Sequence, residues 1–401
     1  MLRKRSALVP EIPRLRGSGG RPLRLAHLTT IDMSLSLLLG TELTVDVESG
    51  FDTLGISAPG PYVSAVQALG VQHVPVPSLT RSWDVRRDLR ATYDLAEVLR
   101  SLQLDVLHTH NPKTGVLGRL LGRVLRIPVV VNTCHGLWAG HTDGLAKRSF
   151  VYTAEAVAAQ ASHAELYQNG QDRETMRRAV PGWRSRVVGN GVDLERFRPD
   201  WAARASVRAE LGIADDELLV GGVGRRVAEK GIREFIEVAR ALAGKARFVW
   251  IGPADDDKPD AIRDDIDGVD SVAFLGERHD MAAVYSALDA FVLPSYREGF
   301  SRSAMEAAAC GTAMVLSDIR GCREIGVQGQ HLLLVPPRDS VALEEAVSRL
   351  LIDDDLRIRL ATAAQRRAAD AFDQRAVAAT SIATYLAVAR RRGLDWHEEC
   401  A

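Results

Sequence analysis

Short apolar runs alternate with longer amphipathic segments along most of the sequence, and this pattern constrains the fold more than any other feature. A strand followed by a helical crossover to a second, parallel strand produces such an alternation. The sequence therefore predicts an α/β protein built on parallel sheets. The predicted strands are residues 25–28, 43–47, 105–109, 128–133, 218–223, 247–251, 271–275, 290–293, 313–316 and 332–335, and the last helices are residues 341–351, 355–371 and 375–392.

The strands form two series, and the length of 401 residues also exceeds what one hydrophobic core supports. The segment between the two series holds Gly189, Asn190, Gly191 and Pro199, which suit turns and connections. We therefore predict two domains and a C-terminal extension. Their bounds are 24–190 for an N-terminal Rossmann-like domain, 191–375 for a C-terminal Rossmann-like domain, and 376–401 for a helix and tail.

Residues 1–23 are rich in Arg, Lys, Pro and Gly and contain one acidic residue, Glu11. They predict a mobile basic tail. Because this segment lacks the apolar stretch of a signal peptide, and no apolar run of the chain is long enough to span a bilayer, we expect a cytoplasmic protein. Basic residues in such a tail could also contact anionic lipid at the inner face of the membrane.

Composition excludes several classes of function. The 51 Lys and Arg residues balance the 52 Asp and Glu residues, so no overall positive field exists to bind nucleic acid. The four cysteines lie far apart without a C-x-x-C pair, which fits neither a zinc cage nor a disulfide scaffold. Any anion site must therefore be local.

One such local site follows the strand at 218–223. The segment "GRRVAEKG" supplies glycines, Arg225 and Lys230, and an amphipathic helix starts near Gly231. Glycines let a ligand approach the backbone, the helix start offers unpaired N–H groups, and the two cations can contact a phosphate. The segment favours phosphate binding, although a strand, turn and helix with two basic residues is often only structural.

A second segment, "FVLPSYREGFSRSAMEAAACGTAMVLSDIRGCREI", passes from a buried strand through a loop with Glu298 to a short helix that begins near Ser301 or Ser303 and carries Glu306. Ligands bind at the carboxyl ends of strands in open α/β sheets. Two carboxylates there could accept hydrogen bonds from the vicinal hydroxyls of a sugar nucleotide. The alternative is a dipole partner for the helix and a solvated glutamate.

Together these two segments and "GNGVDLERF" at the domain connection resemble the retaining glycosyltransferases of family 4, which have the GT-B fold, two Rossmann-like domains facing across a cleft. The resemblance runs from about residue 24 to 390. The segment "LAHLTTIDMSLSLLLG" lacks the paired glycines of many members and looks like the branch that builds bacterial polysaccharides on lipid-linked sugars. The resemblance implies a hexosyltransferase that needs no cofactor or metal besides its nucleotide-sugar substrate.

The same resemblance implies roles for individual residues. Arg225 and Lys230 would bind the donor diphosphate, Glu306 would hold the ribose, and Glu298 would contact the transferred sugar. The backbone of Gly299, Phe300 and Ser301 would position the sugar and phosphate. On the acceptor side, His135 follows a predicted strand and would approach the transferred sugar.

Three other features are weaker candidates. His108 and His110 flank a strand end, but a zinc site would need a third ligand that the sequence does not identify. Asp255 opens an acidic run that could imitate a metal-binding D-x-D motif, although its prolines predict a solvated loop. Residues 115–127 predict a cover helix with Val116, Leu120, Leu121, Val124 and Leu125 on one stripe and Arg119, Arg123 and Arg126 on another.

The resemblance therefore implies transfer of a hexose or N-acetylhexosamine from a UDP-sugar to a glycan, and the branch resemblance implies that this glycan is carried on a polyprenyl diphosphate. Alternatives are a nucleotide-sugar epimerase of similar architecture and a subunit that binds nucleotide sugars without turnover. Peripheral contact with the inner leaflet is a further expectation, because Arg81, Arg86, Arg87 and Arg90 surround Trp83 and could join the arginines of residues 115–127 in a basic face.

Overall fold

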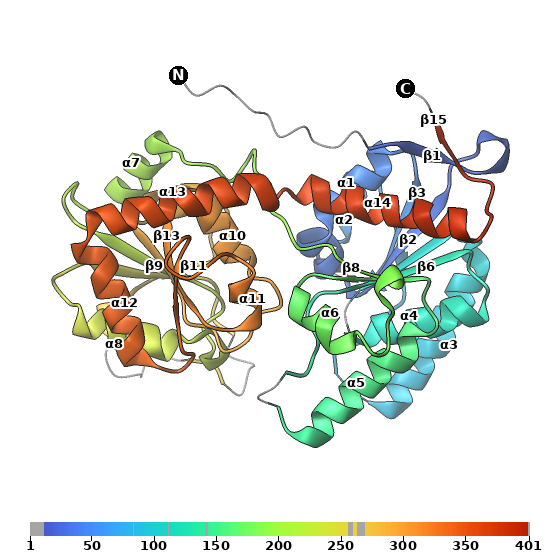
Figure 1. Cartoon of the computed structure of the whole chain (residues 1–401), viewed down its shortest axis with the longest axis horizontal. Helices are drawn as coiled ribbons and strands as arrows, with labels where there is room; N and C mark the ends of the chain where they lie inside the picture. Colours follow the sequence, from blue (N-terminus) through green and yellow to red (C-terminus); the bar gives the residue numbers. More distant parts are fainter. Residues whose placement is uncertain are drawn as a thin grey trace. The chain divides into compact units, whose positions relative to one another are not determined.

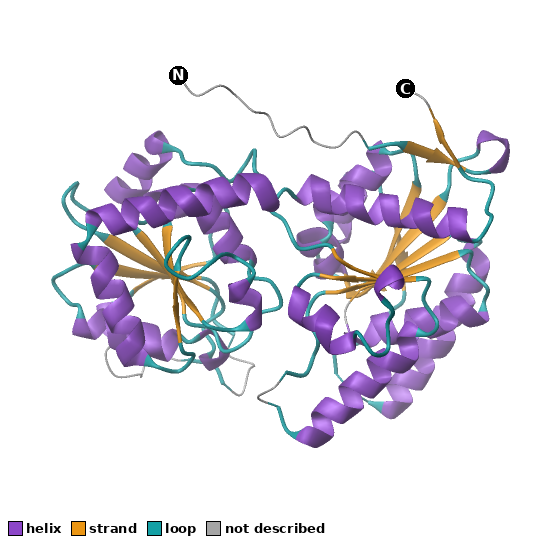
Figure 2. Ribbon diagram, in the orientation of Figure 1, coloured by secondary structure: helices purple, strands orange, loops and turns teal. Residues whose placement is uncertain are grey.

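A computed structural model describes residues 12–82, 84–110, 112–140, 143–255, 260–262 and 269–399. The chain divides into two compact units, each built on its own parallel sheet (Figures 1 and 2). Unit 1 runs to Gly189 and resumes at Gln374, and unit 2 is Asn190–Asp373. The prediction of an α/β protein with two parallel-sheet, Rossmann-like domains is confirmed.

The sheet of unit 1 has seven parallel strands, in the spatial order β4 (Gln72–Pro75), β3 (Asp52–Ala58), β2 (Arg24–Ile31), β5 (Val106–His110), β6 (Val129–Cys134), β7 (Ala164–Tyr167) and β8 (Ser185–Val187). Both faces are covered, which is typical of parallel sheets. One face carries α1 (Gly40–Glu48) and α14 (Gln374–Arg391), and the other carries α3 (Val85–Leu102) and α4 (Pro112–Val124). Further helices of the unit are α2 (Val63–Ala68), α5 (Leu145–Ala159) and α6 (Gly170–Met176).

The alternation along β2 and β5 explains how this sheet is buried on both sides. Leu25 of β2 packs in the cluster that contains residues of α1 and α14, whereas its neighbour Ala26 packs in the cluster that contains residues of α3. Successive side chains of a strand point to opposite faces. His27 and His108, which are paired in the register of β2 and β5, therefore share the face covered by α1 and α14.

The sheet of unit 2 has six parallel strands, in the order β11 (Ala273–Gly276), β10 (Arg247–Ile251), β9 (Leu219–Val223), β12 (Ala290–Leu293), β13 (Ala313–Ser317) and β14 (Leu333–Val335). Its helices are α7 (Trp201–Glu210), α8 (Ile232–Ala241), α9 (Met281–Ala287), α10 (Arg302–Ala309), α11 (Arg320–Arg323), α12 (Ser340–Ile352) and α13 (Asp354–Ala371). After β9 the chain first builds β10 and β11 on one side and then returns to place β12 on the other. The carboxyl ends of β9 and β12 thus form the topological switch point of this sheet.

The terminal segments differ from the predicted tails. Arg14–Arg16 forms strand β1, which pairs antiparallel with β15 (His397–Glu399). Leu15 and Leu23 are fully buried against Ile382 and its neighbours in α14, so hydrophobic contact holds residues 14–23 in place. The tail prediction is therefore wrong for these residues. Residues 1–11 lie outside the described part of the chain.

The strand predicted at residues 43–47 is wrong, because these residues belong to helix α1. The alternation of Leu43, Val45 and Val47 imitates a strand, but the buried residues of the segment are Leu43, Val45 and Asp46. Leu43 and Val45 pack in two different clusters, as a helix buried on two sides allows. The polar Asp46 inside the buried face concealed the helical period, and its burial becomes important below.

Helix α4 also packs differently from the prediction. Its buried face contains Gly118, Gly122 and Arg119, whereas Leu120 and Val124 are 38% and 74% exposed. A Cβ at Gly118 would lie 2.6 Å from side-chain atoms of Leu28 and Thr109. The glycines therefore let α4 approach the sheet closely. Of the predicted apolar stripe, Leu121 and Leu125 pack against the core, whereas Leu120 and Val124 face outward.

Candidate functional site

The first part of the candidate site is the corner that joins β9 to α8. Lys230 ends a short 3₁₀ helix, Ala228–Lys230, and Gly231 then adopts a left-handed conformation with φ +72° before α8 starts. A Cβ at Gly231 would lie 2.0 Å from the carbonyl oxygen of Pro294. Only glycine lets this corner lie so close to the loop after β12. Arg225 and Lys230 are therefore held at the carboxyl end of β9, as the sequence indicated.

The second part is the loop between β12 and α10, which carries Glu298, Gly299 and Phe300. Ser301 caps α10, because its hydroxyl accepts a hydrogen bond from the backbone N–H of Ala304 at 3.3 Å. Phe300 is buried and packs edge-on against Phe372. A Cβ at Gly321 would lie 2.5 Å from the carbonyl oxygen of Glu298, so the loop is also supported from α11. Rigid packing thus fixes the loop at the start of a helix.

An ion pair joins the two parts. The Lys230 Nζ lies 2.7 Å from the Glu298 Oε1, and the two side chains are 23% and 13% exposed. The sequence placed these residues at one edge of a sheet, and the structure brings them into contact. A partly buried cation at the switch point can bind an anionic group of a ligand. Because an ammonium has three donors, Lys230 can contact such a group and Glu298 together.

Arg225 pairs with Asp255 rather than with an element of the β12 loop. Asp255 is therefore not the solvated acid that the proline-rich context predicted, since it contacts a candidate ligand-binding cation. Asp256 and Asp257, the rest of the acidic run, lie outside the described residues.

Glu306 lies on α10 in a different set of contacts. Its Oε2 accepts a hydrogen bond from the Tyr285 hydroxyl at 3.0 Å, and the Arg302 guanidinium lies 3.9 Å from its Oε1. Burial raises the pKa of Glu306, and the charges of Arg302 and Arg196 oppose that rise. The carboxylate is thus oriented by a tyrosine of α9 and lies near a cation of the domain connection. Sequence reasoning gave neither residue a role: no motif distinguishes Tyr285, and Arg196 lies in the segment "GNGVDLERF", which contributed only to the family resemblance.

His135 belongs to unit 1 and follows β6 directly. Its Nε2 lies 3.0 Å from the Nδ1 of His110. Burial lowers the pKa of His135 to about 4, although the Gln168 side chain opposes that effect. His135 is therefore a neutral imidazole near pH 7. The third histidine that the sequence did not identify beside His108 and His110 is His27, whose nitrogens lie within 4.8 Å of theirs.

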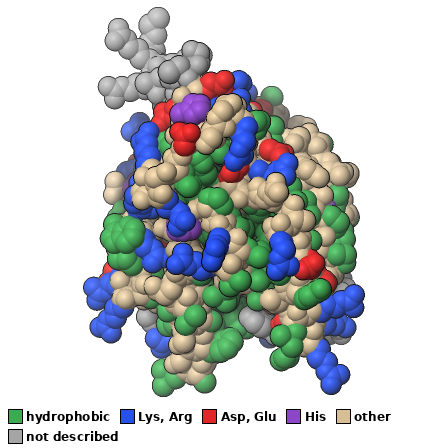
Figure 3. Space-filling view, turned by 90° about the vertical axis from the view of Figure 1, so that its right-hand side faces the viewer, with side chains coloured by type: hydrophobic (Ala, Val, Ile, Leu, Met, Phe, Trp, Pro, Cys, Tyr) green, Lys and Arg blue, Asp and Glu red, His purple; other side chains and the backbone are tan. Residues whose placement is uncertain are grey.

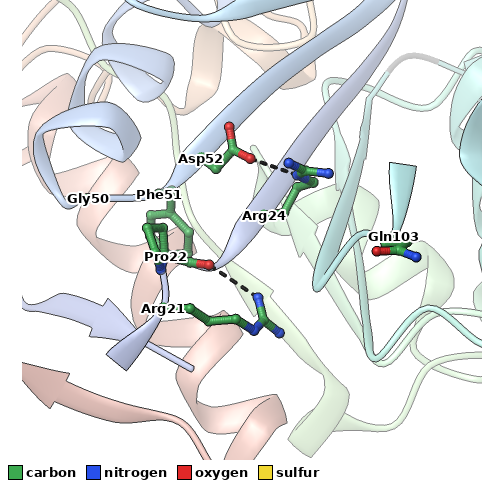
Figure 4. A pocket seen from close by; sticks show the side chains of 7 residues that line it. All are labelled: Arg21, Pro22, Arg24, Gly50, Phe51, Asp52 and Gln103. Atoms are coloured by element: carbon green, nitrogen blue, oxygen red, sulfur yellow. Dashed lines mark hydrogen bonds and ion pairs between the residues drawn. The ribbon is translucent and has the colours of Figure 1, made fainter. Parts of the chain in front are cut away.

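A pocket of about 740 Å³ lies elsewhere in unit 1, between Arg21, Arg24, Asp52 and Gln103 (Figure 4). Arg24 begins β2 and Asp52 begins β3, so this pocket lies at the amino ends of the strands. A carboxylate neutralises the charge of each arginine, since Arg24 pairs with Asp52 and Arg21 pairs with Asp105. The pocket is therefore at the opposite edge from His135, and we assign no ligand to it.

Comparison with known proteins places this geometry in a family. Residues 48–196 match the model described as glycosyltransferase family 4, and residues 217–353 match the model of glycosyl transferases group 1. The chain is also 31% identical over 308 residues to a D-inositol 3-phosphate glycosyltransferase of Xylanimonas cellulosilytica, covering 72% of this chain and 73% of that protein. The chain belongs to glycosyltransferase family 4.

Two further comparisons describe the relatives of this glycosyltransferase. It is 29% identical over 313 residues to the N,N'-diacetylbacillosaminyl-diphospho-undecaprenol alpha-1,3-N-acetylgalactosaminyltransferase of Campylobacter jejuni, with 74% of this chain and 81% of that protein covered. The structure of Anabaena HepE in complex with UDP superposes with a TM-score of 0.77 at 18% identity, covering 91% of this chain and 99% of that one. The predictions of a family 4 hexosyltransferase and of the GT-B fold are confirmed. Among the described helices of this glycosyltransferase, none combines the length and apolarity needed to cross a bilayer.

Proposed function

We propose that this glycosyltransferase moves a hexose or N-acetylhexosamine from a UDP-sugar to a glycan carried on a polyprenyl diphosphate, with retention of the anomeric configuration. The observation that carries the proposal is the Lys230–Glu298 pair at the switch point of unit 2. The acceptor class is supported by the Campylobacter relative, whose name specifies a diphospho-undecaprenol substrate. UDP as the carrier is supported by the complex of the Anabaena neighbour.

In this proposal the donor enters with its diphosphate toward Lys230 and Arg225. Both cations are paired with carboxylates, so donor binding exchanges or extends these pairs. Glu306 holds the ribose hydroxyls through the carboxylate that Tyr285 orients. Glu298 accepts a hydrogen bond from the transferred sugar, and the backbone of residues 299–301 contributes donors at the start of α10.

The reaction then needs little acid or base chemistry from side chains. Lys230 and Arg225 stabilise the negative charge that develops on the departing diphosphate. That diphosphate accepts the proton of the attacking hydroxyl on the same face of the sugar, which retains the configuration. His135 acts from the acceptor side as a neutral hydrogen-bonding group, consistent with its lowered pKa. We assign no metal ion or additional cofactor to the site.

A lipid-linked acceptor also requires access to a membrane, and one surface of unit 1 fits that need. On α3, Val85, Leu89 and Tyr93 recur every fourth residue and are 77%, 68% and 67% exposed. Exposed arginines at 86, 87 and 90 lie between them. An apolar stripe flanked by arginines is typical of helices that insert shallowly into anionic membranes.

The neighbouring helices extend this surface. Helix α4 exposes Val124, and α5 exposes Leu145, Phe150 and Val157. Figure 3 shows hydrophobic and basic side chains side by side on a face of the molecule. We propose that α3, α4 and α5 contact a bilayer rich in anionic lipid, which keeps the enzyme beside its acceptor. Trp83, which the sequence placed in this patch, lies outside the described residues, and Arg119 is buried and does not contribute.

Replacing Leu89 and Tyr93 together with serine should weaken binding to vesicles of phosphatidylglycerol and phosphatidylcholine about tenfold or more. The reason is the loss of inserted apolar groups, each buried CH₂ contributing about 0.8 kcal/mol. Vesicle sedimentation measures the partition. Serine at Val341 and Ile352 is the matched control, since these residues are similarly exposed on α12 of unit 2. Equal binding by both variants would exclude the α3 surface.

The proposed reaction is tested by incubating the enzyme with radiolabelled UDP-sugars and a polyprenyl-diphosphate-linked glycan, then separating the lipid-linked product. We expect transfer of one hexose or N-acetylhexosamine with its anomeric configuration retained. Isomerised sugar without acceptor would favour the epimerase alternative. Binding of UDP without transfer across a panel of acceptors would favour a subunit that does not catalyse transfer.

Glu298→Gln should lower kcat about 100-fold in that assay without weakening UDP binding. Glutamine fills the same space but provides a weaker acceptor for the sugar hydroxyl in the transition state. It also removes a negative charge beside the diphosphate and releases Lys230, so the Kd for UDP should be unchanged or lower. Titration calorimetry measures that Kd. Weakened UDP binding with unchanged kcat would contradict the role given to Glu298.

A further inference from the structure

A chain of buried polar groups crosses the interior of unit 1 and has no place in the proposed donor site. It starts at Asp46 on α1, continues through His27 on β2 and His110 on β5, and ends at His135 after β6. The first three side chains are fully buried. The strand register explains why these residues meet. His27 is paired with His108, and His110 lies two residues further along β5, so all three side chains point to the same sheet face.

Every link of this chain is a short contact. The Nε2 of His27 lies 2.8 Å from the Oδ2 of Asp46, and the Nδ1 of His27 lies 2.9 Å from the Nε2 of His110. The Nδ1 of His110 lies 3.0 Å from the Nε2 of His135. The rings of His27 and His110 are stacked, with centroids 5.2 Å apart and planes inclined by 17°.

The contacts restrict where the hydrogens can be. A neutral imidazole has one donor nitrogen and one acceptor nitrogen. If the Nε2 of His27 donates to Asp46, its Nδ1 accepts from the Nε2 of His110. The Nδ1 of His110 must then accept from the Nε2 of His135, which leaves the His135 Nδ1 as an acceptor. The direction of the first hydrogen bond thus determines the tautomer of the last ring.

We propose that Asp46, His27 and His110 are positioning residues, which form a hydrogen-bonded relay that orients the His135 ring and determines which of its nitrogens carries hydrogen. This inference rests on the proposed role of His135 toward the acceptor or the transferred sugar. The three residues touch no substrate and act only through His135. Second-layer hydrogen bonds of this kind commonly fix the tautomer and orientation of a functional histidine.

The cost of burying Asp46 supports a functional role. Its Oδ1 is buried without a hydrogen-bond partner, and burial raises the pKa of this carboxyl. Such an incompletely satisfied carboxylate is expensive for stability, since an unsatisfied buried polar group costs about 1–3 kcal/mol. A packing role alone would be filled better by an apolar residue.

Other polar groups lie beside the hydrogen-bonded residues Asp46, His27 and His110 without breaking the contacts between them. Glu42 of α1 lies 3.7 Å from the Nδ1 of His108, and its pKa is raised by burial to about 6. His108 bonds instead to the Tyr385 hydroxyl of α14 at 2.6 Å and to the Thr133 hydroxyl of β6 at 2.7 Å. Both nitrogens of His108 are therefore used outside the chain.

The protonation of His27 sets the direction of the chain. Burial disfavours the charged ring, but the hydrogen bond and charge of Asp46, together with the charge of Glu42, raise the pKa of His27 overall. A charged His27 donates from both nitrogens. His110 then accepts at Nε2 and donates from Nδ1, so His135 accepts at Nε2 and carries its hydrogen on Nδ1. In the His110–His135 hydrogen bond, donor and acceptor thus exchange roles when His27 gains a proton, and His110 and His135 both change tautomer.

The spacing of His27, His108 and His110 is also compatible with a metal ion. In the structure, however, these rings direct their nitrogens to each other, to Asp46, to His135 and to hydroxyl groups. The hydrogen-bonded arrangement therefore accounts for all of their nitrogens.

The test is ¹⁵N NMR of histidines in the full chain, with resonances assigned by single substitutions. In the unsubstituted protein, His110 and His135 should have the same tautomer at every pH. Both should carry hydrogen on Nε2 above the ionisation of His27 and on Nδ1 below it, with one common midpoint. Different tautomers, separate midpoints, or one equivalent of bound metal by elemental analysis would each overturn the proposal.

Substitution provides a second readout. In His27→Phe the Nε2 of His110 loses its acceptor, so His110 and His135 should both hold Nδ1–H at high pH. His108→Phe is the matched control, because it removes a buried histidine of the same cluster outside the chain and should leave the tautomer of His135 unchanged. His27→Phe should lower kcat about tenfold while the Kd for UDP stays the same. An unchanged tautomer in folded His27→Phe would contradict the relay.

These readouts separate the relay from the proposed function. The tautomers are measured without substrate, so they test the relay even if no sugar transfer is found. If transfer occurs and the tautomers do not follow the expected pattern, only the relay fails. If His27→Phe does not fold, the pH series on the unsubstituted protein still decides the question.

Discussion

Lys230→Ala should weaken UDP binding about 10- to 100-fold, which corresponds to about 1.4–2.7 kcal/mol. Lys230 provides a charged donor at the switch point of unit 2, and losing a hydrogen bond to a charged group costs about 1.5–3 kcal/mol. The substitution also leaves Glu298 without the cation 2.7 Å from its Oε1. An unpaired carboxylate there repels the diphosphate, so the loss should lie at the upper end of this range.

Titration calorimetry with UDP and with pyrophosphate makes this prediction specific. Lys230→Ala should weaken both ligands, whereas Glu306→Gln should weaken UDP alone, because Glu306 is assigned to the ribose. Lys245→Ala is the control, since Lys245 is an exposed cation of the same unit beyond the end of α8. Equal affinities for UDP in Lys230→Ala and Lys245→Ala would remove Lys230 from the site.

Gly231→Ala should destabilise unit 2 by more than about 3 kcal/mol and abolish measurable UDP binding. An L-residue in the left-handed conformation costs about 1–2 kcal/mol by itself. The added Cβ would also lie 2.0 Å from the carbonyl oxygen of Pro294, which belongs to the backbone and cannot rotate away. In this variant the segment that carries Lys230, between β9 and α8, must therefore move away from the loop between β12 and α10, which carries Glu298.

Gly244→Ala separates the two costs. Gly244 has φ +79° and nothing within 4 Å of an added Cβ. The stability lost in this variant therefore comes from the left-handed backbone conformation alone. Urea unfolding, with hydrogen exchange in β9 and β12 to identify unit 2, compares the variants. We expect a loss of about 1 kcal/mol for Gly244→Ala with intact UDP binding. Similar stability of the two variants would mean that the corner tolerates the clash.

Local pattern predicted most of the architecture of unit 2. Its strands occur where the apolar runs occur, and α8 and α10 begin beside Gly231 and Ser301. The parallel order then places the ends of β9 and β12 together, so the Lys230–Glu298 contact follows from motifs on two neighbouring strands. Sequence reasoning succeeds here because each residue lies in a recognisable strand, turn and helix.

Unit 1 was harder to predict because polar side chains are buried among its hydrophobic clusters. The buried Asp46 made helix α1 resemble a strand, and the buried glycines and Arg119 of α4 add to that helix a packed surface that its apolar residues do not indicate. The Arg119 guanidinium is 1% exposed and pairs with Glu165 at 3.0 Å. Its burial depends on a partner from a distant strand, which no local pattern reveals.

The same limit applies to the histidines. His108 and His110 are visible as a pair because they are two residues apart on β5. His27 joins them only through the pairing of β2 with β5, and Asp46 only through the packing of α1 on that sheet. Long-range register, rather than sequence spacing, assembles the chain that leads to His135.

A crystal structure of the full chain with UDP would test the central claim most directly. The account predicts the diphosphate in contact with Lys230 and Arg225, and the ribose hydroxyls on Glu306. The Glu298 carboxylate should face the space beyond the second phosphate, where the transferred sugar would lie. Density for UDP at another edge of either sheet, with Lys230 still bound only to Glu298, would contradict it.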